Sequence, residues 1–341
     1  MLVKGSDYFV KSAASIARKL GVAEFVIGLT LVAVGTSIPE LVSSIIASQK
    51  QQSGIIIGNV VGSNIANIGL IVGIAAVIHI IRTRQEMLKR DGYIMLFAAL
   101  LFFVFSINRT ISRIEAVIFI FLYFAYVMFL VGTKPKLRGK YNFKDFIRHF
   151  FGFKYLITVK NKIANDLNKS TNNETIPAEE RKIKESSKAG SAKDVLILII
   201  SGFAVVFGAE FLVEKAIFFA NFFNIPKTLI GISLVAVGTS LPELSVSVSA
   251  ARKGYGDIAV GNIIGSNIAN IFLVLGASAL IFPLSILKST LLFTTPFMLF
   301  VSLLLLIFIK SQWEIRRIEG IIFIVLYSLF MIFLFFSNIA L

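Results

Sequence analysis

The stretch GLTLVAVGTSIPEL at residues 28–41 recurs as GISLVAVGTSLPEL at residues 231–244. The copies are 203 positions apart, and the same spacing leads without a gap to GNVVGSNIANIGLIVG at 58–73 and GNIIGSNIANIFLVLG at 261–276. About 26 of the 46 positions from 28 to 73 are identical to their partners. Identity of this extent at a fixed spacing indicates an internal duplication. Each copy places one glutamate, Glu40 or Glu243, within an otherwise apolar run.

The composition predicts an integral membrane protein. Of 341 residues, 56% are hydrophobic and 16% are charged, and the mean hydropathy is +0.84. Apolar runs of roughly 17 to 25 residues match the length of helix that crosses about 30 Å of hydrocarbon, and no alternating ten-residue pattern favours a barrel. The chain has no cysteine and only two histidines, which leaves no disulfide, iron–sulfur cluster, thiol catalysis or zinc site. We therefore expect no cofactor.

The net charge of +15 does not indicate nucleic-acid binding. The basic residues concentrate between the apolar runs, where the positive-inside rule and anionic lipid account for them. The expected partners are the lipid bilayer and transported ions, with no nucleic acid and no obligate protein partner.

The apolar runs predict ten spans in an all-α polytopic fold. They lie at approximately 1–17, 24–48, 55–80, 92–107, 114–132, 194–222, 228–250, 257–281, 286–309 and 317–339. An odd number of spans in each copy makes the second copy enter the membrane from the opposite side. Inverted-topology repeats of this kind are typical of secondary transporters. The predicted units are a five-helix repeat at 1–132, a basic cytoplasmic linker at 133–193 and an inverted five-helix repeat at 194–341.

The distribution of basic residues predicts a multi-pass plasma-membrane protein with both termini outside. With the linker placed in the cytoplasm, the short loops on that side hold most of the loop lysines and arginines. Within the linker, residues 141–156 could form an amphipathic surface helix, or the whole linker could be a flexible tether. In the second copy an apolar stretch at 195–207 precedes the segment equivalent to residues 5–10, whereas only four residues precede Gly5. We therefore expect the first helix to be truncated at its N-terminus.

Proline predicts a break in the second span of each repeat. Pro39 and Pro242 lie mid-membrane, where proline removes a backbone donor and clashes with the preceding turn. The order Ser37-Ile38-Pro39-Glu40 also resembles a helix start, with serine as N-cap and glutamate three residues later. Irregular backbone at this depth is tolerated where it lines a cavity, and its freed carbonyl groups can act as oxygen ligands.

The two glutamates are predicted to bind a cation. A capping box would explain one glutamate but not its depth, because an acidic residue at the bilayer centre costs about 2.5–3.5 kcal/mol. No lysine or arginine in either motif supplies a counter-charge. A bound cation is the remaining candidate.

The second motif adds neutral oxygen ligands. Ser63 and Asn67 lie four residues apart on one helical face, and Ser266 and Asn270 repeat the pattern. Interhelical hydrogen bonding between close-packed helices is the alternative reading of these residues. Carboxylate, hydroxyl, amide and main-chain oxygens together suit Ca²⁺ with six to eight ligands, and also Na⁺.

The doubled GTS-x-PE and GSNIAN motifs resemble the sodium/calcium exchanger family of the cation/Ca²⁺ antiporter superfamily, in particular its prokaryotic members. The resemblance implies exchange of cytoplasmic Ca²⁺ for external Na⁺ by alternating access, with four cation sites at the membrane centre. It implies that Glu40, Glu243, Thr36 and Thr239 are metal ligands. It adds to the cation-binding set Ser37, Ser240, Ser63, Ser266, Asn67 and Asn270, and the main-chain oxygens of Ala33 and Ala236. Family members often carry aspartate where this chain has Asn270. Because asparagine is neutral and both repeats carry it, the two glutamates carry all of the site's negative charge.

The function expected from these residues is antiport, with no enzymatic activity. Ca²⁺ and Na⁺ would compete for Glu40 and Glu243, while the first and sixth spans slide to switch access. A proton/Ca²⁺ antiporter, in which protonation of the same glutamates releases Ca²⁺, stays open as an alternative. A passive channel fits broken inverted repeats less well, and an intramembrane hydrolase lacks a base beside Ser37 or Ser240.

Overall fold

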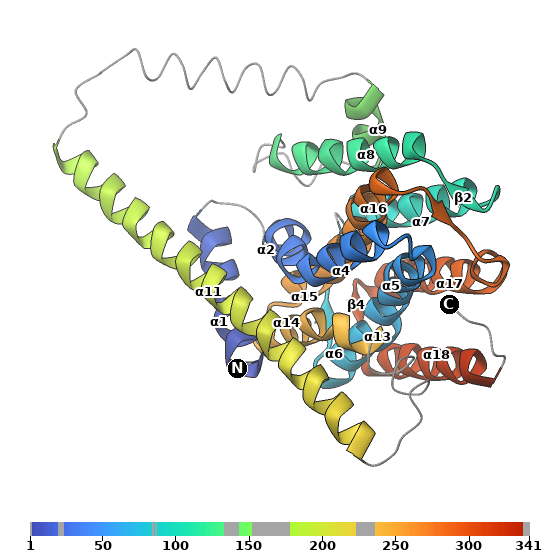
Figure 1. Cartoon of the computed structure of the whole chain (residues 1–341). Coiled ribbons are helices and arrows are strands. Elements are labelled where there is room, and N and C mark those ends of the chain that lie inside the picture. Colours follow the sequence, from blue (N-terminus) through green and yellow to red (C-terminus); the bar gives the residue numbers. More distant parts are fainter. Residues whose placement is uncertain are drawn as a thin grey trace.

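Helices form nearly all of the described chain. The computed structural model describes residues 2–19, 24–83, 85, 87–132, 143–151, 178–222 and 236–336 (Figure 1). The first half contains α1 (Leu2–Lys19), α2 (Glu24–Ile27), α3 (Ala33–Thr36), α4 (Ile38–Gln49), α5 (Ser53–Ala66), α6 (Gly73–Ile78), α7 (Tyr93–Phe105), α8 (Arg113–Gly132) and α9 (Phe143–Phe151). The second half contains α11 (Ala178–Phe222), α13 (Ala236–Thr239), α14 (Leu241–Arg252), α15 (Gly256–Ala269), α16 (Gly276–Ile281), α17 (Thr295–Gln312) and α18 (Arg317–Phe336).

Short π-helical stretches join several of these helices. They are η1 (Gly28–Val32), η2 (Asn67–Val72), η3 (Met87–Gly92), η6 (Asn270–Leu275) and η7 (Thr290–Thr294). Two of them, η2 and η6, begin at the paired asparagines of the second motif. π-Helical turns inside α-helices occur frequently at functional sites, and the sequence analysis did not predict these.

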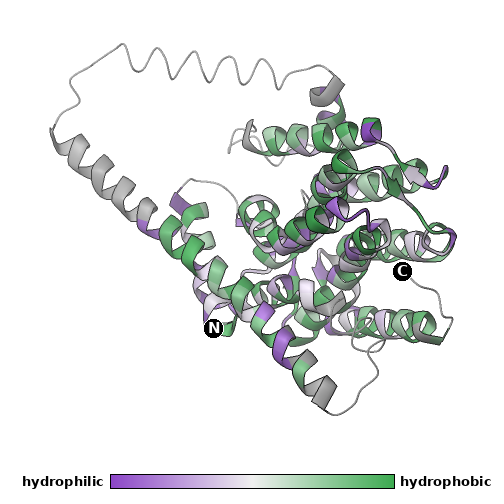
Figure 2. Ribbon diagram, in the orientation of Figure 1, coloured by the Kyte–Doolittle hydropathy of each residue, from purple (hydrophilic) through white to green (hydrophobic). Residues whose placement is uncertain are grey.

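The described helices confirm a multi-pass helical membrane protein. Six are long and apolar enough to cross a membrane, or seven if the bent pair 24–36 and 38–49 counts as one span. Figure 2 shows hydrophobic residues along most helix lengths and hydrophilic ones gathered toward their ends. The bent pair lies where Pro39 predicted a break.

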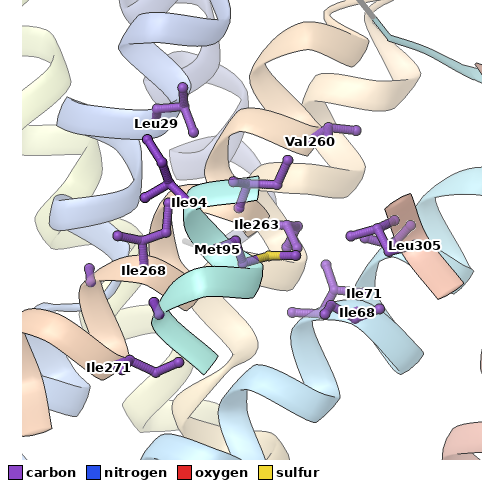
Figure 3. Close-up of a cluster of buried hydrophobic side chains, with 14 of the residues drawn as sticks. Leu29, Ile68, Ile71, Ile94, Met95, Val260, Ile263, Ile268, Ile271 and Leu305 are labelled. Carbon is purple, nitrogen blue, oxygen red and sulfur yellow. The ribbon is translucent and has the colours of Figure 1, made fainter. Parts of the chain in front are cut away.

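Two of these apolar helices lie at the centre of the molecule instead of facing lipid. In the span through α15 and α16, 94% of the most apolar stretch is buried inside the protein. The corresponding share is 72% for the span through α5 and α6 and 28% for α18. Their buried side chains contribute to the cluster that Figure 3 shows, with Ile68 and Ile71 from one half and Ile263 and Ile268 from the other.

Glycines let the second span pack closely on α15. A Cβ on Gly265 would lie 2.5 Å from the Leu29 carbonyl oxygen, and one on Gly261 would lie 2.7 Å from the Phe25 carbonyl oxygen. Gly28 lies on the opposite side of the same contact. Only glycine permits this approach of two backbones.

Two short antiparallel strand pairs join the halves of the chain. β1 (Ile81–Arg82) pairs with β4 (Glu314–Ile315), and β2 (Thr110–Ile111) pairs with β3 (Leu284–Ser285). Each pair therefore takes one strand from the first half and one from the second.

Helices α1 and α11 lie side by side along one edge of the molecule (Figure 1). α11 begins at Ala178, within the segment predicted as a linker. The amphipathic-helix alternative for residues 141–156 corresponds to α9, whose Phe146 is buried and contacts the rings of Tyr126 and Phe129. The rest of that segment lies outside the described residues.

Candidate cation site

The break in each second span positions the two glutamates. Ser37 precedes α4 with φ −87° and ψ 7°, and Ser240 precedes α14 with φ −87° and ψ 4°. The axes of the helices on either side of Ser37 differ by 44°. The capping-box prediction is wrong in one respect, since neither serine side chain caps its helix.

The first-half break contacts the second half of the chain. Instead of capping α4, Ser37 Oγ donates to Glu243 Oε1 across 3.2 Å. Thr36 Oγ1 lies 3.1 Å from Asn262 Oδ1 and 3.5 Å from Ser266 Oγ. Glu40 and Glu243 are each 1% exposed, and they lie close enough to interact electrostatically. The structure therefore brings together residues that the sequence separates by more than 200 positions.

Most of the buried side-chain atoms without hydrogen-bond partners in the described residues belong to the predicted site. Among the described residues, eleven buried side-chain nitrogen or oxygen atoms have no partner. Seven of them belong to the predicted site: Glu40 Oε2, Glu243 Oε2, Ser63 Oγ, Thr239 Oγ1, Ser240 Oγ, Asn67 Oδ1 and Asn270 Oδ1. A buried oxygen that lacks a donor is unfavourable unless something else satisfies it. A cation would do so for carboxylate, amide and hydroxyl oxygens alike.

The amides of Asn67 and Asn270 are held by two residues that the sequence analysis did not select. Asn67 Nδ2 donates to Asn267 Oδ1 at 2.9 Å, and Asn270 Nδ2 donates to Asn64 Oδ1 at 3.0 Å. Asn64 and Asn267 are themselves 1% exposed. Their position inside the doubled GSNIAN motif was the available signal.

A second pair of asparagines, also missed, supports the glutamate helices. Asn59 Nδ2 donates to Ser44 Oγ at 3.0 Å, and Asn262 Nδ2 donates to Ser247 Oγ at 3.0 Å. Asn59 also donates to the Glu40 carbonyl oxygen at 3.3 Å. These bonds tie α4 to α5 and α14 to α15, which fixes the helices that carry the carboxylates.

The predicted main-chain ligands differ in their surroundings. The Ala33 carbonyl oxygen accepts from Ser37 N at 3.0 Å and from Thr36 Oγ1 at 3.2 Å, so it is already engaged. Ala236 is the first residue of α13, and its side chain lies outside the described part of the structure.

The chemistry of the cluster is restricted to hard oxygen donors. Within the described residues, no group of three or more histidine, cysteine, aspartate or glutamate side chains could hold a metal ion. Two carboxylates surrounded by neutral oxygens suit cations such as Ca²⁺ and Na⁺.

The comparisons with known proteins identify the family. The model of the sodium/calcium exchanger protein family matches residues 1–132 and 193–336. The chain belongs to the sodium/calcium exchanger family. It is thus a membrane transport protein, not an enzyme.

The exchanger relatives match over nearly their whole length. The chain is 57% identical over 335 residues to the sodium/calcium exchanger MaX1 of Methanosarcina acetivorans, covering 98% of this chain and 95% of MaX1. It is 34% identical over 333 residues to the uncharacterized membrane protein MJ0091 of Methanocaldococcus jannaschii, covering 96% and 92%. A solved structure of the sodium-calcium exchanger NCX_Mj superposes with a TM-score of 0.75 at 32% identity, covering 96% of this chain and 93% of that one.

Proposed function

We propose that this exchanger is a secondary active antiporter that moves Ca²⁺ against Na⁺ across the membrane, with Glu40 and Glu243 as shared cation ligands. The observation that carries the proposal is the set of seven unpartnered buried oxygens in the predicted site, two of which belong to these carboxylates. MaX1 and NCX_Mj are described as sodium/calcium exchangers, which supports both ions as substrates.

Charge balance explains how the two ions would exclude each other. Two carboxylates neutralise one Ca²⁺, so Na⁺ ions that occupy the same oxygens must displace it. The proposed ligands are Glu40, Glu243, Thr36, Thr239, Ser37, Ser240, Ser63, Ser266, Asn67 and Asn270, with main-chain oxygens of Ala33 and Ala236. A site that holds either Ca²⁺ or Na⁺ couples the two fluxes.

Reciprocal contacts support the proposed architecture of ten spans in two inverted repeats, 1–132 and 194–341, around a cytoplasmic linker. Asn64 Nδ2 donates to the Asn267 carbonyl oxygen at 3.3 Å, and Asn267 Nδ2 donates to the Asn64 carbonyl oxygen at 3.4 Å. Contacts of the form i to j and j to i are those of a two-fold axis. Combined with five spans per repeat, such an axis lies in the membrane plane.

Alternating access is supported by contacts that break this symmetry. Thr36 contacts Asn262 and Ser37 contacts Glu243, whereas Thr239 Oγ1 and Ser240 Oγ lack partners. The Asp7 carboxylate accepts from Lys253 Nζ at 2.8 Å. At the equivalent positions, among the described residues, no ion pair joins Lys50 to Glu210.

The same asymmetry extends to helix packing. α1 packs along α14, whereas α11 contacts α4 at most marginally. We propose that the described arrangement is one of two related states, and that exchange of roles between α1 and α11 opens the site to the other side. In this proposal the protein lies in the plasma membrane with both termini outside.

The decisive experiment is Na⁺-driven uptake of radiolabelled Ca²⁺ into proteoliposomes. Glu40→Gln and Glu243→Gln keep the side-chain shape but remove the charge, so each should abolish exchange. Glu314→Gln, at a partly exposed ion pair with Arg316, is the matched control and should retain it. Full exchange in either site variant would overturn the proposed ligands.

Separate gradients distinguish the alternatives. With Na⁺, H⁺ and K⁺ gradients imposed one at a time, we expect Ca²⁺ flux with Na⁺ alone. Flux driven by a pH gradient without Na⁺ would replace the proposal with a proton/Ca²⁺ antiporter on the same fold. Saturable counterflow separates either antiporter from a channel. If three Na⁺ exchange for one Ca²⁺, membrane potential adds about 2.3 kcal/mol per 100 mV.

A further inference from the structure

Four asparagine side chains meet where the two central spans cross. Asn64 lies in the last turn of α5, and Asn67 begins η2. Asn267 and Asn270 occupy the equivalent places on α15 and η6. All four are 1% exposed. Two of them, Asn67 and Asn270, are proposed ligands, and the role of the other two is not explained by direct binding.

The direction of the hydrogen bonds in this group follows from the main chain. Asn64 Nδ2 lies 3.3 Å from the Asn267 carbonyl oxygen. Since a carbonyl oxygen can only accept, the Asn64 amide must present its nitrogen there and its oxygen elsewhere. That oxygen faces Asn270 Nδ2 at 3.0 Å. The Asn270 amide therefore turns its nitrogen toward Asn64 and leaves its own Oδ1 without a partner.

The same chain of bonds exists in the other repeat. Asn267 Nδ2 donates to the Asn64 carbonyl oxygen at 3.4 Å, and Asn267 Oδ1 accepts from Asn67 Nδ2 at 2.9 Å. Asn67 Oδ1 is again buried without a partner. In both repeats the bonds run from a main-chain carbonyl to an unpartnered amide oxygen, so the oxygen of each proposed ligand is oriented by a residue of the opposite repeat.

Sulfur atoms complete the surroundings of the orienting residues. Asn64 Nδ2 lies 3.7 Å from Met298 Sδ, and Asn267 Nδ2 lies 3.7 Å from Met95 Sδ. Met95 lies within the apolar cluster of Figure 3. A thioether has no hydrogen to donate, so neither methionine can satisfy the amide oxygen that would face it if the amide were turned.

This geometry disfavours an ionised carboxylate at position 67 or 270. An ionised aspartate at 270 would place an acceptor oxygen against Asn64 Oδ1, at about the 3.0 Å now spanned by a hydrogen bond, whereas a protonated one could still donate. Turning the Asn64 amide would relieve that contact but bring its oxygen against the Asn267 carbonyl oxygen. Either arrangement leaves two buried acceptors facing each other, which is unfavourable.

We propose that Asn64 and Asn267 are positioning residues that orient the Asn270 and Asn67 oxygens toward the cations and restrict those positions to neutral side chains. The inference rests on the proposed cation site. According to this proposal, the site holds only two carboxylates because Asn64 and Asn267, which do not bind the ion themselves, exclude a third negative charge.

The test is a double-mutant cycle with Ca²⁺ binding and exchange as separate readouts. Asn64→Ser removes the fixed acceptor and supplies a hydroxyl that can donate to a carboxylate. Alone, Asn64→Ser should raise the apparent Ca²⁺ KM by about 10-fold or more, as loss of a residue that orients a metal ligand does, while the maximal rate changes less. At alkaline pH, where the introduced carboxyl group is ionised, Asn270→Asp alone should lose Ca²⁺ binding and exchange, and adding Asn64→Ser should restore both at least in part.

The second repeat provides an independent copy of the experiment. Asn67→Asp should be rescued by Asn267→Ser, and each rescue should be specific to its crossed partner. Asn108→Asp adds a carboxylate in an exposed loop and is the control for the added charge. Calorimetric titration of monodisperse purified protein measures Ca²⁺ affinity directly. It therefore tests the orientation of the asparagine oxygens whether or not transport is Na⁺-driven.

Two results would overturn the inference. One is wild-type Ca²⁺ affinity in Asn270→Asp alone at alkaline pH, where its carboxyl group is ionised. The other is a folded Asn64→Ser, Asn270→Asp protein no better than Asn270→Asp, with the same outcome for the pair at 267 and 67. Absence of Na⁺-driven flux in the unmodified chain would instead count against the proposed function.

Discussion

Ser37 and Glu243, which are 206 positions apart in the sequence, are joined by a 3.2 Å hydrogen bond from Ser37 Oγ to Glu243 Oε1. The equivalent serine, Ser240, has no partner for its hydroxyl group. A helix break with nearly identical backbone angles in both repeats thus serves different contacts. Two nearly identical sequences occupy different environments, as expected if they exchange roles during transport.

Cross-linking should detect this exchange of roles. The chain has no cysteine, so introduced pairs report without background. Asp7→Cys with Lys253→Cys replaces an ion pair formed in the described arrangement, and Lys50→Cys with Glu210→Cys marks the equivalent open positions. With a short bifunctional thiol reagent, we expect both pairs to cross-link during turnover and each cross-link to stop exchange.

The ionic condition should bias the two cross-links in opposite directions. An ionic condition that speeds formation of one cross-link should slow formation of the other. Gel mobility after proteolysis measures the extent of each cross-link. Single-cysteine variants control for reagent effects, and reductive cleavage of a disulfide-containing linker should restore flux. Equal rates at both pairs in every condition would contradict the two-state interpretation.

A buried ion pair should contribute strongly to stability. Arg90 Nε and Nη2 donate to Asp91 at 3.0 Å and 2.9 Å, Tyr126 OH donates to the same carboxylate at 3.1 Å, and both ion-pair side chains are 0% exposed. Asp91→Asn removes the carboxylate charge from this buried pair and should cost about 3–5 kcal/mol. Thermal unfolding in detergent measures the loss. Glu314→Gln, at a partly exposed pair, should cost about 0–1 kcal/mol, and equal losses would refute the argument.

Close backbone packing predicts different outcomes at two equivalent glycines. In Gly265→Ala the new Cβ would lie 2.5 Å from the Leu29 carbonyl oxygen and 2.7 Å from Ala33 Cβ. We expect it to lower stability by about 1–3 kcal/mol. Gly62→Ala is the matched variant, because its Cβ would meet nothing within 4 Å among the described residues. Matching unfolding curves for the two would show that this contact does not limit stability.

Cation binding should stabilise the protein by satisfying the free oxygens of the site. Ca²⁺ at 100 times its Kd should add about 2.7 kcal/mol to the free energy of unfolding. Mg²⁺ should have a smaller effect, because it requires shorter, octahedral coordination and loses water reluctantly. The shift should vanish in Glu40→Gln and persist in Glu314→Gln. A Ca²⁺ shift that survives Glu40→Gln would place the ion elsewhere.

The helical architecture was predictable because it depends on local patterns. Apolar runs predicted most bounds of the described helices of membrane length to within a few residues, and Pro39 and Pro242 predicted the breaks that the structure has at Ser37 and Ser240. α11 was the exception, since its helix extends N-terminally to Ala178 through polar sequence. Polarity predicts exposure to water, but it does not prevent a helix from continuing.

The side-chain contacts of the site were less accessible to sequence reasoning. The duplicated glutamates and asparagines could be selected, because intramembrane polar residues are unusual. Which amide orients which depends on packing between repeats, so Asn64 and Asn267 remained unrecognised although they lie within the quoted motif. The Ser37 hydroxyl likewise donates to Glu243 in the other repeat instead of capping its own helix, and this partner depends on tertiary structure.

The reciprocal pairs at Asn64 and Asn267 have a consequence for how the molecule is assembled. Each half presents a self-complementary surface, the property of an isologous dimer interface, and neither half alone brings the two carboxylates together. The β1–β4 and β2–β3 pairs cross the same boundary. The contacts between the halves thus resemble those of a dimer interface, and covalent linkage fixes a one-to-one ratio of the two halves. Because the halves are joined, each can diverge at positions such as Asp7 and Glu210 while the shared interface stays matched.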